Sequence, residues 1–280
     1  MPSLVEWRVD ERPPRLWTRL YVAVMWVLRD KRAFTGQEQT VWIVRPRRRR
    51  PAARVLYLHG GGYVHPLTPD YWRLVRALTA APAEVVVPAY PLAPVAHVDD
   101  VVPRLVALAR SLDDLPLVVM GDSAGGALSL VLAGHLRGAA RRPDAVVLLS
   151  PWLDATLDED QVSDLEATDP MLEETGLRAA GRWWSGGRTT TDPDVSPVFG
   201  NLDGLPPVDV HVGAHDILRP AVELLAQRAD RADDVVLTVH ERTAMFHVWM
   251  TRFVPEGAQT RRILRDRVRA VARPTEPRHP

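Results

Sequence analysis

The stretch MGDSAGGAL, Met120–Leu128, decides the fold of this chain. An apolar run at residues 117–119 precedes it, and an apolar helical pattern follows it to residue 136. A strand that turns at once into a helix around a serine fits the G-x-S-x-G elbow, in which the serine Oγ is exposed on a strained backbone. Glycines flank Ser123 because larger side chains there would collide with the neighbouring strand and helix. Small-residue turns of this kind also occur without chemistry, so the surrounding sequence has to decide its role.

Short apolar runs alternate with helical patterns on both sides of this stretch. Continuous apolar strands separated by helices predict an α/β fold, with a mostly parallel sheet covered on both faces. We expect strands at residues 40–44, 54–58, 84–87, 117–120, 145–149, 208–212 and 235–239. We expect helices at residues 71–80, 101–112, 124–136, 176–184 and 217–228. Prolines on both sides of the four arginines at 47–50 predict a solvated hairpin tip between the first two strands.

The alternation breaks between about residues 154 and 198, where the sequence is acidic, then helical, then rich in Ser, Gly and Thr. An insertion that covers the sheet explains this break. The expected organisation is an N-terminal cap segment at 1–34, a core at 35–154 and 198–280, and a cap insertion at 155–197. Within the first segment, residues 16–28 predict an amphipathic helix with a broad apolar face.

Composition excludes several classes of function. The 280 residues carry no net charge, so nothing indicates a nucleic-acid partner. The chain has no cysteine, which excludes disulfides, thiolate nucleophiles and cysteine-ligated zinc. The apolar run at 20–28 is shorter than the roughly 20 residues that span a bilayer, and no signal-cleavage site follows it. We therefore expect a cytoplasmic protein without a stable membrane span; peripheral membrane contact through Trp17, Tyr21 and Trp26, and a homodimer, stay open.

A second motif, His59-Gly60-Gly61-Gly62-Tyr63, follows the strand expected at 54–58. Three consecutive glycines let backbone N–H groups turn inward together and stabilise an oxyanion. The alternatives are a plain glycine turn and a phosphate loop, but the Lys-Ser/Thr ending of a P-loop is absent. This motif lies 64 residues before Ser123, and the two motifs together are far more specific than either alone.

A catalytic serine needs a base and a carboxylate that orients the base. Asp216 follows the strand expected at 208–212, and His247 lies in the loop after the strand expected at 235–239. The chain order Ser123, Asp216, His247 is that of α/β-hydrolases. His240 and His215 are alternative bases, and Asp216 is alternatively the N-cap of the following helix.

These motifs resemble those of the bacterial hormone-sensitive-lipase-like branch of the α/β-hydrolases, a group of carboxylesterases. The matching stretches are HGGGY, GDSAGG, YPLAP (Tyr90–Pro94), DPDVSP (Asp192–Pro197) and MFH (Met245–His247). The resemblance implies an α/β-hydrolase fold with a small helical cap. It implies Ser123 as nucleophile, Asp216 as orienting acid and His247 as base. It also implies an oxyanion hole formed by the N–H groups of Gly61, Gly62 and Ala124, without a metal or cofactor.

The function expected from these residues is a serine carboxylesterase that hydrolyses short- to medium-chain acyl esters through an acyl-enzyme. Its partner is then a small-molecule ester. One alternative is a non-catalytic small-ligand receptor on the same fold, as in the plant gibberellin receptors, which resemble this branch without its catalytic histidine. Another is an amide or peptide hydrolase with the same triad. Large side chains that are candidates for a pocket wall are Trp72, Met171, Trp183, Trp184, Met245 and Phe246.

Overall fold

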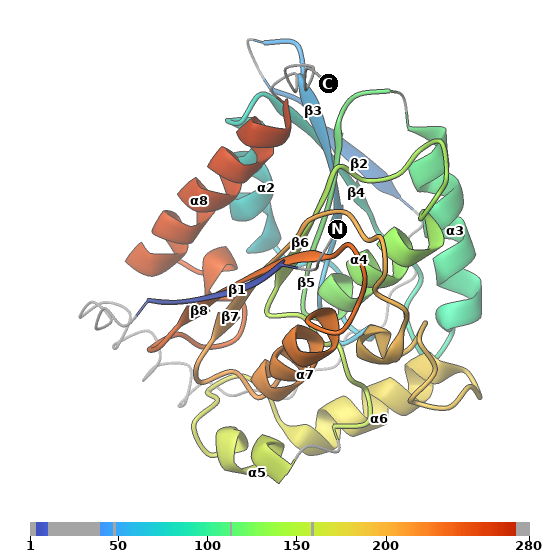
Figure 1. The fold of residues 1–280 in the computed structure, drawn as a ribbon, viewed down its shortest axis with the longest axis vertical. Coiled ribbons are helices and arrows are strands. Elements are labelled where there is room, and N and C mark those ends of the chain that lie inside the picture. The colour runs from blue at the N-terminus through green and yellow to red at the C-terminus, as the bar shows by residue number, and fades with distance from the viewer. Residues whose placement is uncertain (1–3, 11–39, 47–48, 113, 158–159, 273–280) are drawn as a thin grey trace.

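One sheet of eight strands runs through the molecule, in the order β1-β8-β7-β6-β5-β3-β4-β2 (Figure 1). The computed structural model describes residues 4–10, 40–46, 49–112, 114–157 and 160–272. The strands are β1 (Leu4–Asp10), β2 (Val41–Val44), β3 (Ala53–Leu58), β4 (Ala83–Pro88), β5 (Leu117–Asp122), β6 (Ala145–Leu149), β7 (Val208–Gly213) and β8 (Val236–Arg242). Only β2 is antiparallel to its neighbour, β4; every other neighbouring pair is parallel. The mostly parallel sheet expected from the sequence is confirmed.

The hydrophobic pattern locates the central strands well because these strands are buried on both faces. Every residue of β3, β5 and β6 is buried, because helices cover both faces of the sheet. Such strands read as unbroken apolar runs rather than as alternating ones. The seven expected strands, β2 to β8, begin and end within three residues of their expected positions; the largest difference is β8, which continues to Arg242.

Helices pack on the two faces of the sheet in two groups. Figure 1 shows α2 and α8 on one side, and α3, α4 and α7 on the other. The helices are α2 (Tyr71–Thr79), α3 (Val98–Ser111), α4 (Ala124–His135), α5 (Asp160–Glu166), α6 (Glu174–Ser185), α7 (Arg219–Ala229) and α8 (Pro255–Ala272). None of the helices described here is long and apolar enough to cross a membrane.

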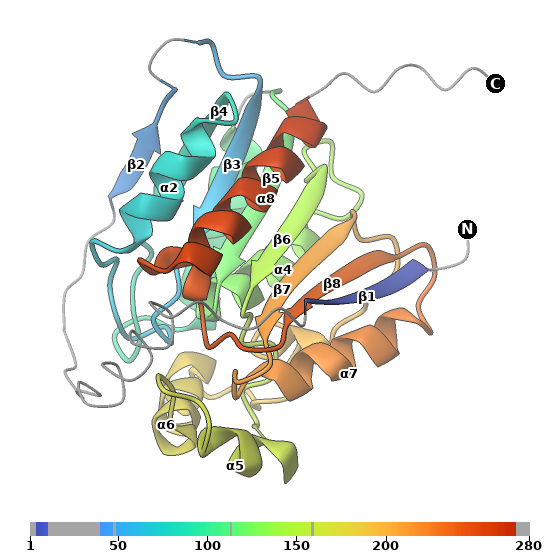
Figure 2. The same cartoon turned by 90° about the vertical axis from the view of Figure 1, so that its left-hand side faces the viewer.

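The segment between β6 and β7 carries α5 and α6. Figure 2 shows both helices beyond one end of the sheet, away from the two layers of helices that cover its faces. The helix expected at 176–184 is α6, and it buries Leu177, Ala180 and Trp184. The segment therefore covers the end of the sheet at which β5 turns into α4.

Two expectations at the edges of the sheet were wrong. The hairpin between the first two strands does not form: β2 pairs with β4, because both edges of β3 are already occupied by β4 and β5. Within the expected N-terminal cap segment at 1–34, Leu4–Asp10 forms a strand instead, parallel to β8 at the edge of the sheet. The helix expected at 16–28 lies outside the described residues.

Candidate active site

Ser123 lies on the turn between β5 and α4, with φ 52° and ψ −122°. A serine rarely adopts this left-handed backbone conformation, so the surrounding structure has to enforce it. The turn is closely packed: a Cβ at Gly121 would lie 2.1 Å from Gly125 O, and a Cβ at Gly125 would lie 2.0 Å from Leu58 O. Glycine is required at both positions, and the geometry is that of the nucleophile elbow expected from the sequence.

The glycine loop after β3 lies directly against this elbow. The Gly60 N–H donates to Asp122 Oδ1 at 3.0 Å, which ties the loop to the residue before Ser123. Gly61 and Gly62 have φ values of 104° and 60°, a region that favours glycine. In the described part of the chain, the N–H groups of Gly61, Gly62 and Ala124 donate to no protein acceptor. These three donors are therefore free to bind an oxyanion.

Aromatic packing holds the glycine loop from behind. The Tyr90 hydroxyl donates to the His59 carbonyl at 2.6 Å, and the His59 and Tyr90 rings stack at a centroid separation of 4.3 Å. Burial lowers the pKa of His59 to about 4, so its imidazole is neutral near pH 7. The motif residue His59 thus supports the loop as a neutral packing group rather than as a charged one.

Asp216 and His247 meet because two loops come into backbone contact beyond β7 and β8. The His215 N–H donates to the Met245 carbonyl at 3.0 Å, and a Cβ at Gly213 would lie only 2.3 Å from Met245 O. Across this contact, His247 Nδ1 lies 3.1 Å from Asp216 Oδ1 and 3.0 Å from Oδ2. Asp216 is fully buried and His247 almost so.

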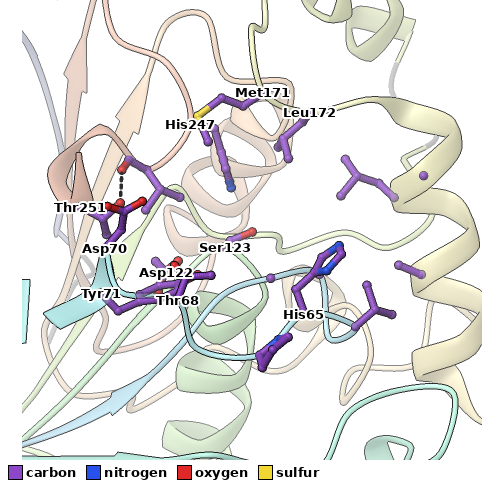
Figure 3. A pocket seen from close by; sticks show the side chains of 18 of the residues that line it. His65, Thr68, Asp70, Tyr71, Asp122, Ser123, Met171, Leu172, His247 and Thr251 are labelled. Carbon is purple, nitrogen blue, oxygen red and sulfur yellow. Dashed lines mark hydrogen bonds between the residues drawn. The ribbon is translucent and has the colours of Figure 1, made fainter. Parts of the chain in front are cut away.

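The contact with Asp216 raises the pKa of His247. Burial by itself lowers the pKa of His247, but the charge of Asp216 and its hydrogen bond outweigh burial and raise the pKa above its ordinary value. Since Nδ1 faces the carboxylate, Nε2 is the nitrogen left for a substrate or a nucleophile. Figure 3 shows the His247 ring pointing toward Ser123.

The alternative residues lie elsewhere. His240 is on β8, where its ring stacks on His211 at 4.5 Å, and His215 is exposed. The N-cap of α7 is Leu218, and Asp216 Oδ1 accepts the Leu218 N–H at 3.0 Å while also facing His247. Of the candidate bases, the structure brings only His247 to Asp216 among the described residues.

A cavity of about 480 Å³ opens over Ser123 (Figure 3). One wall includes Gly61, Gly62 and His247, and residues between β6 and β7 form the other, including Met171, Leu172, Leu177 and Ala180. Of the six large side chains suggested for this wall, only Met171 lines the cavity. Trp184, Met245 and Phe246 are buried in the core and Trp183 is half exposed, so side-chain size alone does not decide which residues reach the cavity.

Sequence patterns do not single out two buried carboxylates near Asp216 and His247. Asp122 accepts the Tyr57 hydroxyl at 2.6 Å, and burial raises its pKa to about 6. Asp169, between α5 and α6, is fully buried and accepts the Ile217 N–H next to Asp216. The only sequence signal for Asp169 is an Asp-Pro pair in a loop, which by itself indicates a turn. Among the described residues, no cluster of three or more His, Asp or Glu side chains could hold a metal ion.

Comparison with known proteins finds esterases. A family model described as an alpha/beta hydrolase fold matches residues 55–251. An acetyl-hydrolase of Streptomyces hygroscopicus is 33% identical over 223 residues, which are 76% of this chain and 74% of the relative. An esterase of Acinetobacter venetianus is 28% identical over 73% of this chain and 71% of its own length. The crystal structure of an esterase from the bacterial hormone-sensitive lipase family superposes with a TM-score of 0.73, at 26% identity over 94% of both chains.

Proposed function

The chain belongs to the α/β-hydrolase fold family and is a carboxylic ester hydrolase, and from that premise we propose that Ser123 is its nucleophile, His247 its general base and acid, and Asp216 the residue that orients His247. The observation that carries this assignment is the hydrogen bonding of His247 Nδ1 to both carboxylate oxygens of Asp216, in a cavity that Ser123 also lines. The resulting order of contacts is the one that serine hydrolysis requires.

In the first half of the reaction, the Ser123 Oγ attacks the ester carbonyl while His247 Nε2 takes its proton. The negative charge of Asp216 stabilises the imidazolium that forms. The carbonyl oxygen becomes an oxyanion and accepts the N–H groups of Gly61, Gly62 and Ala124. Ala124 is also the first residue of α4, so the positive end of that helix dipole favours the same charge.

In the second half, the leaving alcohol takes the proton from His247 and departs, which leaves Ser123 acylated. A water molecule then gives a proton to His247 and attacks the acyl carbonyl. The same N–H groups stabilise the second oxyanion, and release of the acid restores Ser123. These steps use only residues of this chain and water.

The test of the nucleophile is Ser123→Ala. This variant should fold as the wild type does and lose about 10⁴-fold or more in kcat, because the covalent route is removed. Intact mass spectrometry after treatment with a fluorophosphonate should find one adduct on the wild type and none on the variant. An equal adduct on Ser123→Ala would place the nucleophile elsewhere, and a wild type that is neither labelled nor active would favour the ligand-receptor alternative.

We further propose that the acyl groups are short to medium in length. The cavity holds about 480 Å³, and at one part of its wall Arg252 donates to Asp70 at 2.7 Å, a polar contact that a long acyl chain would have to displace. Nitrophenyl butyrate and hexanoate should therefore show kcat/KM values about tenfold or more above that of the palmitate ester. A steady rise of kcat/KM from butyrate to palmitate would contradict this proposal and favour an open, lipid-facing groove.

A further inference from the structure

Asp169 lies in the cap insertion, in the loop between α5 and α6, and its side chain is fully buried. Its Oδ1 accepts two N–H groups of its own loop, from Met171 at 2.8 Å and Leu172 at 3.1 Å. Its Oδ2 accepts the Ile217 N–H at 3.0 Å, across to the loop after β7. No lysine or arginine among the described residues pairs with it; three backbone N–H dipoles and the nearby His247 favour its ionised form.

The three donors belong to the two sides of the site. Met171 and Leu172 line the cavity over Ser123, as Figure 3 shows, and Ile217 directly follows Asp216. Asp216 in turn accepts the Leu218 N–H. The loop that carries the acid is therefore held by two carboxylates, one from the core and one from the cap insertion. A movement of Asp169 would shift the cavity wall and Asp216 together.

The charge of Asp169 also reaches the triad. Burial and the neighbouring charge of Asp216 raise the pKa of Asp169 to about 6, which is the effect expected of two carboxylates that share one site. Burial lowers the pKa of His247. The charges of Asp216, Asp169 and Asp122 all favour its protonated form, and together with the hydrogen bond to Asp216 they raise its pKa overall. The charged groups that face this cluster are thus Asp216 after β7, His247 after β8 and Asp122 at the end of β5.

We propose that Asp169 is a positioning residue of the catalytic centre, which fixes the Asp216 loop and the Met171–Leu172 wall as one unit and adds a second negative charge that favours the imidazolium form of His247. This rests on the proposed function of the triad. The segment between β6 and β7 then does more than line the cavity. The negative charge of its Asp169 contributes to the electrostatic field in which His247 takes and returns its proton.

The test is Asp169→Asn, which preserves the shape of the side chain and removes its charge. We expect kcat to fall about 10- to 100-fold, the range typical of a lost residue that supports a catalytic group. The acid limb of the kcat/KM profile reports the pKa of His247 in the free enzyme, because His247 must be neutral to act as a base. Without the charge of Asp169, that limb should move to lower pH. A purely structural residue would lower activity at every pH and leave the limb in place.

Two further variants keep the test decisive. Asp164→Asn removes an exposed carboxylate from the same insertion and should leave both kcat and the pH profile unchanged. Asp169→Glu retains the charge but displaces the carboxylate, so it should lose kcat while its acid limb stays near that of the wild type. The proposal is overturned if the limb of Asp169→Asn does not move or moves to higher pH, or if Asp169→Glu shifts it as far as Asp169→Asn does.

Failure of this proposal is separable from failure of the proposed function. Asp169→Asn should still form the fluorophosphonate adduct on Ser123, only more slowly than the wild type. Full labelling together with an unshifted acid limb would contradict the role of Asp169 and leave the triad untouched. A wild type without any adduct would contradict the triad itself.

Discussion

Two histidine–carboxylate pairs lie on or just after β7 and β8, and they have different surroundings. The first, Asp216 and His247, lies in the loops that follow β7 and β8. The second lies within the strands: Asp209 is on β7, and His240 on β8 has its Nε2 3.6 Å from Asp209 Oδ1. The same residue types near the same pair of strands thus form two sites, and of these four residues His247 alone lines the cavity over Ser123.

The difference lies in what else each carboxylate contacts. Asp216 directs both oxygens to His247 Nδ1, whereas Asp209 is shared with the Arg267 guanidinium of α8. The ring that stacks on His240 belongs to His211, whose pKa burial and the neighbouring His240 lower to about 3. The pKa of His247 is instead raised. A histidine beside an aspartate is therefore a base candidate only where the carboxylate is committed to it and the ring is open to a substrate.

The largest effect that this comparison predicts is the loss of the base. His247→Ala should lower kcat by about 10⁴- to 10⁶-fold, because the Ser123 proton then has no acceptor within the triad. His240→Ala, the matched substitution in the strand pair, should cost little more than local packing. Steady-state hydrolysis of nitrophenyl butyrate by both purified variants measures the two effects.

The reverse result would break the assignment. If His240→Ala is inactive while His247→Ala retains activity, the base lies on the strand and the contact with Asp216 is structural. Circular dichroism of both variants separates loss of chemistry from loss of fold, since His247→Ala should retain the spectrum of the wild type.

The next effect concerns the carboxylates. Asp216→Asn should lower kcat by about 10⁴-fold, because an amide cannot hold His247 in the tautomer that presents Nε2 to Ser123. Asp209→Asn leaves this site intact and should keep kcat within a few-fold of the wild type, while weakening the contact with Arg267. Comparable kcat losses in both variants would mean that the two pairs do not differ in function as their geometry indicates.

Much of the fold and of the candidate site can be predicted from the sequence, because local sequence patterns indicate the buried strands and the loop that carries His247. Buried parallel strands are continuous apolar runs, so β3, β5 and β6 were located to within two residues. His247 was preferred over His240 because residues 241–247 show no strand alternation. The strand continues to Arg242, two residues further than His240, and His247 still lies in the loop beyond it.

What escaped the sequence depends on contacts between distant segments. Asp169 reaches Ile217, 48 residues further along the chain, and no spacing rule connects an Asp-Pro turn to that N–H group. The pairing of β1 with β8 joins segments that are far apart in the sequence, and the short run at residues 4–10 carries no signal of its partner. The pairing of β2 with β4 rather than β3 was likewise decided by which sheet edge remained available.

The smallest predicted effect is on stability, and it separates His211, which stacks on His240 of the second pair, from His247 of the first pair by the sign of the pH dependence. The pKa of His211 in the folded protein is about 3 against an ordinary value of 6.5, so the unfolded chain binds this proton more readily. His211 therefore destabilises the fold progressively as the pH falls below 6.5. For His247 the folded pKa is raised, so its contribution is fully present below pH 6.5 and is lost as the pH rises through the folded value.

His211→Gln removes the first effect without touching the triad. Between pH 7 and pH 5, the free energy of unfolding of the wild type should fall by about 2 kcal/mol more than that of His211→Gln, the amount that a pKa lowered to about 3 implies over this interval. Urea unfolding at the two pH values measures this difference, and His215→Gln, which replaces an exposed histidine, is the matched control. An equal fall in wild type and His211→Gln would mean that His211 is protonated in the folded protein at pH 5. The stacked His211 and His240 rings would then carry positive charge beside Asp209, and the contrast between the lowered pKa of His211 and the raised pKa of His247 would fail.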